Sequence, residues 1–214
     1  RWLMNAHQVN AYYNPTTNEI CFPAGILQPP FFNLNADDAV NYGAIGVVIG
    51  HEMTHGFDDQ GCNYDAKGNM ENWWTEEDRK TFDAATQKLA AQFDQVDVAP
   101  GLKANGQMTL GENIADQGGL LVAYDAMVKA TEGKEYPEID GLSRDQRFYL
   151  GYARVWGQNI RPEEIIRRTK TDVHSLGKFR VNQTLKNIDT FYTAFGIQEG
   201  DSMYIAPEER VEIW

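Results

Sequence analysis

The stretch "IGHEMTHGFDD", residues 49–59, lies near the end of a segment whose apolar residues recur at helical spacing. This spacing predicts a helix over residues 37–57. Glycines at positions 43, 46 and 50 weaken such a helix by about 1 kcal/mol each relative to alanine, so close packing must compensate for them. We therefore expect this helix to be buried.

His51 and His55 project from the same side of this helix, because residues four apart differ by about 40° around its axis. Two neutral imidazoles at this spacing suit zinc, and Glu52 points beside the metal, where a general base for a zinc-bound water belongs. The alternative is a pair of hydrogen-bonded histidines on an ordinary helix. It is less favoured, because an accidental match has no reason to fall within a buried, glycine-rich helix, where charged and imidazole groups cost free energy unless they are coordinated or hydrogen-bonded.

A catalytic zinc takes three protein ligands, so one more ligand is required. The residues after His55 do not continue the metzincin pattern, because Asp58 and Gly61 stand where glycine and histidine would be needed. The third ligand is therefore His7, His174 or a carboxylate on another segment.

The best carboxylate lies in "TLGENIADQGG", residues 109–119, at the start of a helix predicted from about Thr109 to Lys129. Glu112 and Asp116 stand four apart, so one acid can bind metal while the other holds a ligand histidine by its free ring nitrogen. Thr109 and Glu112 also match a capping box, in which Glu112 would fold back on the helix start. The spacing alone favours neither interpretation.

Composition restricts the class of protein. The chain has 214 residues, 42% of them hydrophobic, and a formal net charge of −12 without a basic stripe, which argues against a nucleic-acid partner. No apolar run approaches the roughly 20 residues of a membrane-spanning helix. We expect Cys21 and Cys62 to be buried thiols rather than a disulfide. The start of the sequence has neither an initiator methionine nor a targeting segment, so we expect a piece of a longer protein.

The remaining pattern predicts one mainly helical domain of the α+β class, with a small sheet near its start. A hairpin is expected around residues 14–18, and Thr75 is expected to open a helix with an apolar face. Loops are expected around residues 100–106. The face of the Thr75 helix comprises Phe82, Ala85, Leu89 and Phe93, and further helices are predicted over 143–159, 162–170 and 183–195.

Several motifs in the same order resemble the catalytic domain of the neprilysin-like zinc metallopeptidases, peptidase family M13. They are "VNAYY", "FPAGILQPPFF", "HEMTHGFDDQG", "GENIADQGGL", "VWGQNIRPE" and "DVHSLGKFR", and the similarity runs from about residue 9 to residue 214. The resemblance implies a thermolysin-like, gluzincin fold and one zinc ion per chain. It also implies metalloendopeptidase activity on oligopeptides, with cleavage on the amino side of large hydrophobic residues.

The resemblance implies that His51, His55 and Glu112 bind zinc, which favours the ligand role of Glu112 over the capping box. It implies that Glu52 is the catalytic base. Asp116 and Asp58 are implied as the partners that orient the two ligand histidines, which agrees with the chemistry expected around a metal.

The resemblance also implies residues that contact the substrate. His174 would stabilise the oxyanion, and Arg180 would bind the substrate carbonyl beyond the cut. Asn10 and Ala11 match the family's substrate-aligning strand, to which a peptide adds as an extra strand. The implied pocket for the large hydrophobic side chain comprises Ile26, Phe31, Val48, Val155 and Trp156.

Some features depart from the family pattern. Members are usually much longer, with a helical N-terminal domain that roofs the active site, and the cysteine framework of animal members is missing here. We therefore expect residues 1–214 to be a single catalytic domain, the C-terminal part of a bacterial protein. Its expected partners are peptide substrates and the missing N-terminal domain. Family habit favours an extracytoplasmic location, at the cell surface, in the periplasm or secreted, although some members are cytosolic.

Two rival functions remain open at this stage. A zinc aminopeptidase would need an acidic anchor for a free α-amine, often in a GxMEN-type stretch, and the sequence has none. A truncated domain that binds peptide without turnover is the other alternative.

Overall fold

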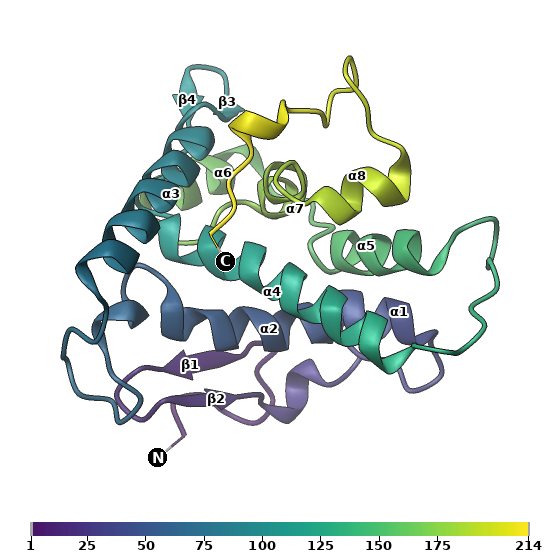
Figure 1. The fold of residues 1–214 in the computed structure, drawn as a ribbon, viewed down its shortest axis with the longest axis horizontal. Coiled ribbons are helices and arrows are strands. Elements are labelled where there is room, and N and C mark those ends of the chain that lie inside the picture. The colour runs from purple at the N-terminus through teal and green to yellow at the C-terminus, as the bar shows by residue number, and fades with distance from the viewer. Residues whose placement is uncertain (1, 214) are drawn as a thin grey trace.

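Two crossing helices form the centre of the computed structural model, which describes residues 2–213. They are α2 (Val47–Thr54) and α4 (Leu110–Ala130), and the other elements surround them (Figure 1). The helix predicted over 37–57 is confirmed as a helical run, but it is not uniform. It consists of α1 (Asp38–Asn41), a π-helical turn (Tyr42–Gly46), α2 and a 3-10 turn (His55–Phe57).

Glycines let the backbones of α2 and α4 approach each other closely. A Cβ atom added to Gly50 would lie 2.8 Å from the carbonyl oxygen of Gly119, and one added to Gly119 would lie 2.7 Å from the amide nitrogen of His51. Only glycine fits at such an approach. The expected burial of this helix is confirmed for the face that carries His51, which is 7% exposed, whereas Ile49 and Met53 on the other side are 39% and 48% exposed.

The larger hydrophobic core lies where α4 packs with α5 (Arg144–Val155), α7 (Gly177–Leu185) and α8 (Asp189–Phe195). A second core lies between the start of α4 and α3 (Glu76–Asp94). Thr75 caps α3 by accepting a hydrogen bond from the amide of Asp78, as the sequence predicts. The predicted apolar face is also confirmed: Phe82, Leu89 and Phe93 are buried, and Ala85 packs against them.

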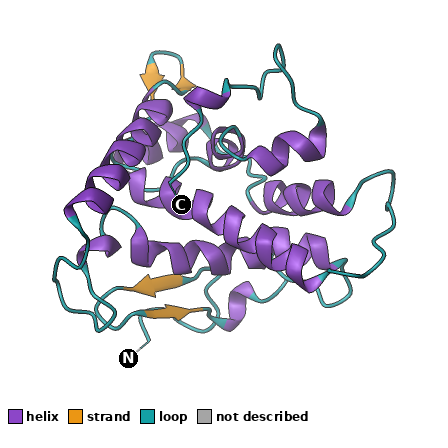
Figure 2. Cartoon of the chain, viewed as in Figure 1, coloured by secondary structure: helices purple, strands orange, loops and turns teal. Residues whose placement is uncertain are grey.

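The strands are short and lie at two edges of the helical body (Figure 2). β1 (Tyr12–Asn14) pairs antiparallel with β2 (Glu19–Cys21), so the predicted hairpin is confirmed. Within the described part of the chain, β1 has β2 as its one partner strand, so its second edge is unpaired. A second hairpin, β3 (Asp97–Ala99) with β4 (Leu102–Lys103), forms where loops were expected.

Some predicted helix boundaries are wrong. The sequence predicts one helix over 183–195, but α7 already begins at Gly177, and α8 starts anew at Asp189. The break occurs at Asn187, whose side chain bonds with Gln92 and accepts the amide of Val211. The helix predicted over 143–159 ends at Val155, whereas α6 (Pro162–Thr171) begins at Pro162 as expected.

A C-terminal strap, defined here as residues 205–213, holds several helices together. Lys88 of α3 donates hydrogen bonds to the carbonyls of Glu208 and Arg210. Val211 is 1% exposed, and its carbonyl accepts a hydrogen bond from Gln117 of α4. The strap ends beside α4 (Figure 1). It therefore joins α3 and α4 through the backbone carbonyls of Glu208, Arg210 and Val211.

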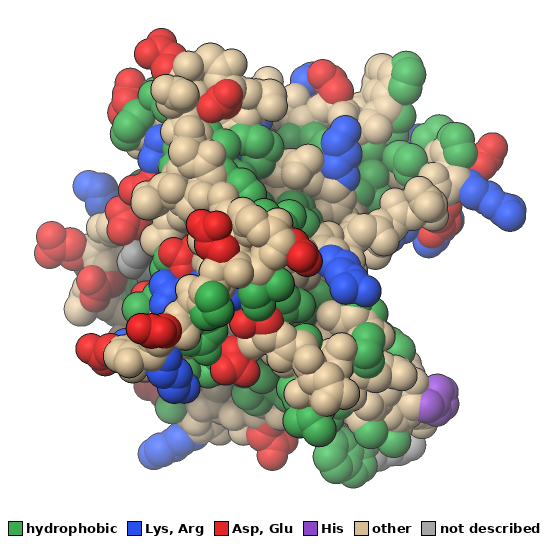
Figure 3. Space-filling model, turned by 90° about the vertical axis from the view of Figure 1, so that its right-hand side faces the viewer, with side chains coloured by type: hydrophobic (Ala, Val, Ile, Leu, Met, Phe, Trp, Pro, Cys, Tyr) green, Lys and Arg blue, Asp and Glu red, His purple; other side chains and the backbone are tan. Residues whose placement is uncertain are grey.

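Other sequence expectations concern the cysteines and the surface. Cys21 and Cys62 are free and buried, as predicted. Between residues 2 and 213, every helix is too short or too polar to cross a bilayer. Acidic and basic side chains are interspersed over the face in Figure 3.

Candidate metal centre and substrate cleft

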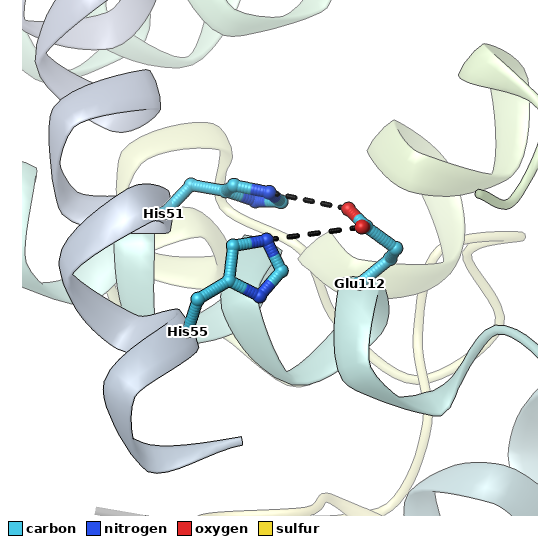
Figure 4. Close-up of side chains that lie close together, drawn as sticks. All are labelled: His51, His55 and Glu112. Atoms are coloured by element: carbon cyan, nitrogen blue, oxygen red, sulfur yellow. Dashed lines mark ion pairs between the residues drawn. The ribbon is translucent and has the colours of Figure 1, made fainter. Parts of the chain in front are cut away.

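Three side chains from two helical segments converge at one point (Figure 4). His51 lies on α2, His55 follows at the start of the 3-10 turn, and Glu112 lies in the first turn of α4. One potential ligand atom from each side chain lies within 4.8 Å of the other two. His51 Nε2 is 3.2 Å from Glu112 Oε2, and His55 Nε2 is 3.7 Å from Glu112 Oε1.

The start of α4 leaves the Glu112 carboxylate free to reach α2. Thr109 occupies the N-cap position, but its side chain makes no capping hydrogen bond. Its hydroxyl instead donates to the carbonyl of Asn105 and accepts from the side-chain Nδ2 of Asn113. The capping box therefore does not form.

The donor atoms fit a zinc ion. Glu112 Oε2 is buried and accepts no hydrogen bond from any residue between 2 and 213, and the Arg180 guanidinium comes no closer than 3.6 Å. A metal cation nearer to this oxygen would compensate for its burial. Two imidazole nitrogens and one carboxylate are a donor set that zinc takes in catalytic sites. His51, His55 and Glu112 thus form a potential metal-binding triad.

Each histidine of the triad is held by a carboxylate at its other ring nitrogen. His51 Nδ1 lies 2.9 Å from Asp116 Oδ1, and His55 Nδ1 lies 2.7 Å from Asp58 Oδ2. A proton held on Nδ1 leaves the Nε2 lone pair directed toward the triad. Asp58 is itself fixed, because its other oxygen accepts the amides of Gln60 and Gly61.

Arg180 and Asp116 form a buried ion pair behind the triad. Arg180 donates to both Asp116 oxygens, over 2.7 and 2.6 Å, and its guanidinium stacks on Trp156 at 3.9 Å from the ring centroid. Burial raises the pKa of Asp116, but Arg180 and His51 outweigh it and hold that pKa below its usual value. Asp116 therefore remains ionised as the partner of His51.

Two groups of the triad region have raised pKa values. Burial lowers the pKa of His51, but the neighbouring carboxylates of Asp116 and Glu112 outweigh this and raise it to about 9. A proton and a metal ion thus compete for His51. Burial raises the pKa of Glu52, an effect that His51 and His55 partly offset. Glu52 is 6% exposed and lines the same cavity as the triad.

His174 approaches the triad from a loop between α6 and α7. Its Nε2 lies 3.2 Å from Glu112 Oε1, and its Nδ1 lies 2.7 Å from Asp172 Oδ1. The side chain is 43% exposed, so its ring borders open space. Sequence patterns alone had marked His174 as no more than one possible third ligand.

A cleft of about 550 Å³ contains the triad, and all the site residues implied by the family resemblance line it. His7, one of the possible third ligands, does not line it. Asn10 and Ala11 lie immediately before β1, which begins at Tyr12. Ala11 and Ile26 are buried in one small apolar cluster, against which Phe31 and Val48 pack. The cleft residues expected from the sequence are Asn10, Ala11, Ile26, Phe31, Val48, His51, Glu52, His55, Asp58, Glu112, Asp116, Val155, Trp156, His174 and Arg180.

The sequence interpretation missed other residues of the cleft. Tyr152 lies on α5, and its hydroxyl donates to the carbonyl of Arg180 over 2.9 Å. Tyr152 stands four residues after Phe148, a spacing typical of core packing, so no sequence signal marks it as a cleft residue. The other missed lining residues include Met4, Val9, Tyr12, Tyr13, Gln60 and Gln158.

Comparisons with known proteins agree with this site. The model of Peptidase family M13 matches residues 10–211. Human neprilysin is 44% identical over 219 residues, which are 100% of this chain and 29% of neprilysin. The neutral endopeptidase of Lactococcus lactis is 40% identical over 213 residues, covering 100% of this chain and 32% of that protein.

A solved structure shows the same fold. The zinc metalloprotease ZMP1 of Mycobacterium tuberculosis, in complex with inhibitor, superposes with a TM-score of 0.97 at 47% identity, covering 100% of this chain and 34% of that chain. The chain thus spans about a third of the length of these relatives. The expected α+β, thermolysin-like fold is confirmed by this similarity. With a family model that covers nearly the whole chain, the protein belongs to peptidase family M13.

Proposed function

We propose that this domain is a zinc-dependent metalloendopeptidase that hydrolyses oligopeptides. The observation that carries the proposal is the convergence of His51, His55 and Glu112 in one cleft, with Glu52 beside them. We further propose that residues 1–214 are one catalytic domain, the C-terminal part of a longer protein whose helical N-terminal domain roofs the cleft. The relatives, which extend well beyond the matched region, support this arrangement.

The proposed chemistry needs a metal, a base and a proton carrier. A zinc ion held by the triad would polarise the scissile carbonyl and make a water molecule more acidic. Glu52 accepts the proton of the attacking water and passes it to the leaving amine. The pKa of Glu52, which burial raises, brings this carboxyl closer to the pH at which it must both accept and donate.

His174 and Arg180 are proposed to bind the reacting peptide. His174 Nε2 faces the triad, where the negative charge of the carbonyl oxygen develops, so it is placed to stabilise that charge. Arg180 uses Nε and Nη2 for Asp116 and leaves Nη1 without a hydrogen bond to the rest of the described chain. We propose that Nη1 binds the substrate carbonyl beyond the cut.

The walls of the cleft suggest how a peptide lies in it. The unpaired edge of β1, preceded by Asn10 and Ala11, can accept an extended peptide as an added strand. We propose that a large hydrophobic side chain after the scissile bond enters an apolar pocket, so that cleavage occurs on its amino side. The pocket comprises Ile26, Phe31, Val48, Val155 and Trp156.

We also propose an extracytoplasmic location for the whole protein, at the cell surface, in the periplasm or secreted. Its similarity to a human membrane metallo-endopeptidase-like protein, at 44% identity, supports this location.

Elemental analysis of protein purified without added metal tests the metal site. We expect about one zinc per chain, and a much lower content in Glu112→Ala, because two histidines alone form an incomplete site. Glu52→Gln should keep the zinc and lose peptidase activity by a factor on the order of 10²–10⁴.

Peptides with blocked and free amino termini test the class of peptidase. An endopeptidase cleaves both, whereas an aminopeptidase requires the free amine. A fully active Glu52→Gln variant, or a protein that takes up no zinc after reconstitution, would contradict the proposal.

A further inference from the structure

Residues 172–176 form a short loop between α6 and α7, called the His174 loop here. Two contacts tie its ends to the rest of the molecule. On one side Asp172 accepts a hydrogen bond from Arg168 of α6 over 3.0 Å, and it also pairs with the ring of His174. On the other side, Ser175 donates a hydrogen bond to Asn113 Oδ1 over 2.8 Å.

The Ser175–Asn113 bond joins the two segments whose alignment matters for the site. Ser175 directly follows His174, and Asn113 directly follows Glu112 on α4. Both are buried, at 7% and 0% exposure. Inside the protein, the bond therefore connects the loop that carries His174 to the helix that carries Glu112.

The orientation of the Asn113 amide is fixed by a second bond. Its Nδ2 donates to Thr109 Oγ1 over 2.9 Å, and Thr109 in turn donates to the carbonyl of Asn105. With the amino group occupied, Oδ1 is directed at Ser175. Asn113 thus presents one acceptor to the His174 loop, in a single orientation.

Packing alone does not hold this loop. A cavity of about 20 Å³, enough for one water molecule, is lined by Asp172, His174 and Ser175 on one side and by Thr109 and Phe179 among others. The side chains of Arg168 and Asp172 are 22% and 25% exposed, so solvent weakens their attraction. The buried Ser175–Asn113 bond is the contact best placed to fix the loop.

We propose that Ser175 and Asn113 are positioning residues, which hold His174 in register with Glu112 so that Nε2 faces the reacting carbonyl. This inference rests on the proposed function of His174. Displacement of a catalytic group by about 1 Å can lower a rate by roughly 10²-fold. Loss of the Ser175–Asn113 hydrogen bond can therefore lower kcat, although neither residue contacts the substrate.

Steady-state kinetics of Ser175→Ala test the proposal. We expect kcat to fall about tenfold, with KM and zinc content unchanged. A more mobile loop holds His174 in the correct position for only part of the time, so the loss in rate is smaller than for a full displacement of the ring. His174→Ala should lower kcat by about 10²–10³-fold, and Ser175→Ala should add no further loss in that background. Ser175→Thr keeps the hydroxyl and should restore most of kcat.

Thr131→Val serves as the matched control. Thr131 is 3% exposed, and its hydroxyl donates to the carbonyl of Met127 near the far end of α4. Its loss should lower the stability without lowering kcat. A tenfold loss from Ser175→Ala that persists in the His174→Ala background, or an unchanged kcat, would overturn the positioning role.

A spectroscopic readout separates this proposal from the proposed function. In the nitrogen-15 spectrum of the histidine rings, Ser175→Ala should broaden or shift the signals of His174 while those of His51 stay fixed. Unchanged His174 signals would overturn the proposal. If His174→Ala itself leaves kcat unchanged, the proposed role of His174 fails, while these signals still decide whether Ser175 positions the ring.

Discussion

The triad and the substrate-facing rim of the cleft are carried by different kinds of structure. His51 and Glu112 belong to helices whose backbones touch at Gly50 and Gly119. The rim includes Asn10, before a strand, and the His174 loop, both irregular and partly exposed. Metal ligands must be held within a few tenths of an ångström, and closely packed helices provide this precision. A peptide substrate must instead enter and leave, so the residues that bind it lie on exposed, irregular segments. This contrast can be tested by substitutions on either side of it.

The largest effect is expected from Gly50→Ala at the helix crossing. The new Cβ would lie 2.8 Å from a backbone carbonyl that cannot move aside, so α2 and α4 must separate. We expect a loss of about 1–3 kcal/mol in the free energy of unfolding and a zinc affinity lowered at least about tenfold. Thermal unfolding and metal titration measure both.

Gly46→Ala is the control on the same helical run. The nearest atoms to its Cβ lie at 3.5 Å, an ordinary contact, so alanine should be neutral or stabilising by up to about 1 kcal/mol. Equal damage from the two substitutions would show that helix propensity, rather than the crossing, limits the triad.

A smaller effect is expected from pH. In metal-free protein the pKa of His51 is raised to about 9 from an unfolded value of about 6.5. Its stabilising contribution is therefore complete below about pH 6.5 and is lost as pH rises through about 9. Zinc displaces that proton, so its binding strengthens over the same range. The Tm difference between zinc-loaded and chelator-treated protein should widen from about pH 6 to about pH 9.

The Asp116→Asn variant tests whether the pKa of His51 causes this pH dependence. The variant removes the charge that raises the pKa of His51, so the stability of its metal-free form should depend less on pH over this range. A wild-type Tm difference that narrows with rising pH would contradict the competition between proton and metal.

The smallest effect is expected at the rim, from Asn10→Ala. One lost hydrogen bond to a peptide backbone is worth about 1 kcal/mol, so KM should rise about fivefold while kcat and zinc content stay unchanged. Gln8→Ala, two residues away and outside the cleft lining, should leave KM as it is. A fall in zinc content in Asn10→Ala would mean that rim and triad are coupled.

The same contrast explains what could be predicted from the sequence. The helices of the triad follow from apolar spacing, and the His51–His55 pair follows from helical geometry. The spacing could not decide whether Glu112 is a metal ligand or part of a capping box. The answer depends on the hydrogen bonds of Thr109 with Asn105 and Asn113, which only the folded structure reveals. The break at Asn187 was missed because its partner Gln92 lies 95 residues away. His174, Arg180 and Asn10 have no periodic pattern, and their implied roles came from family resemblance.

The C-terminal strap has a consequence for how the protein acquires its metal during synthesis. Chains leave the ribosome from the N-terminus, and a domain folds as a unit once its parts are available. His51, His55 and Glu112 all precede the strap in the sequence, and α4 gains the contact between Gln117 and Val211 only once residue 211 has been made. A nascent chain that has not yet reached residue 211 therefore offers zinc three ligands on helices that lack this contact.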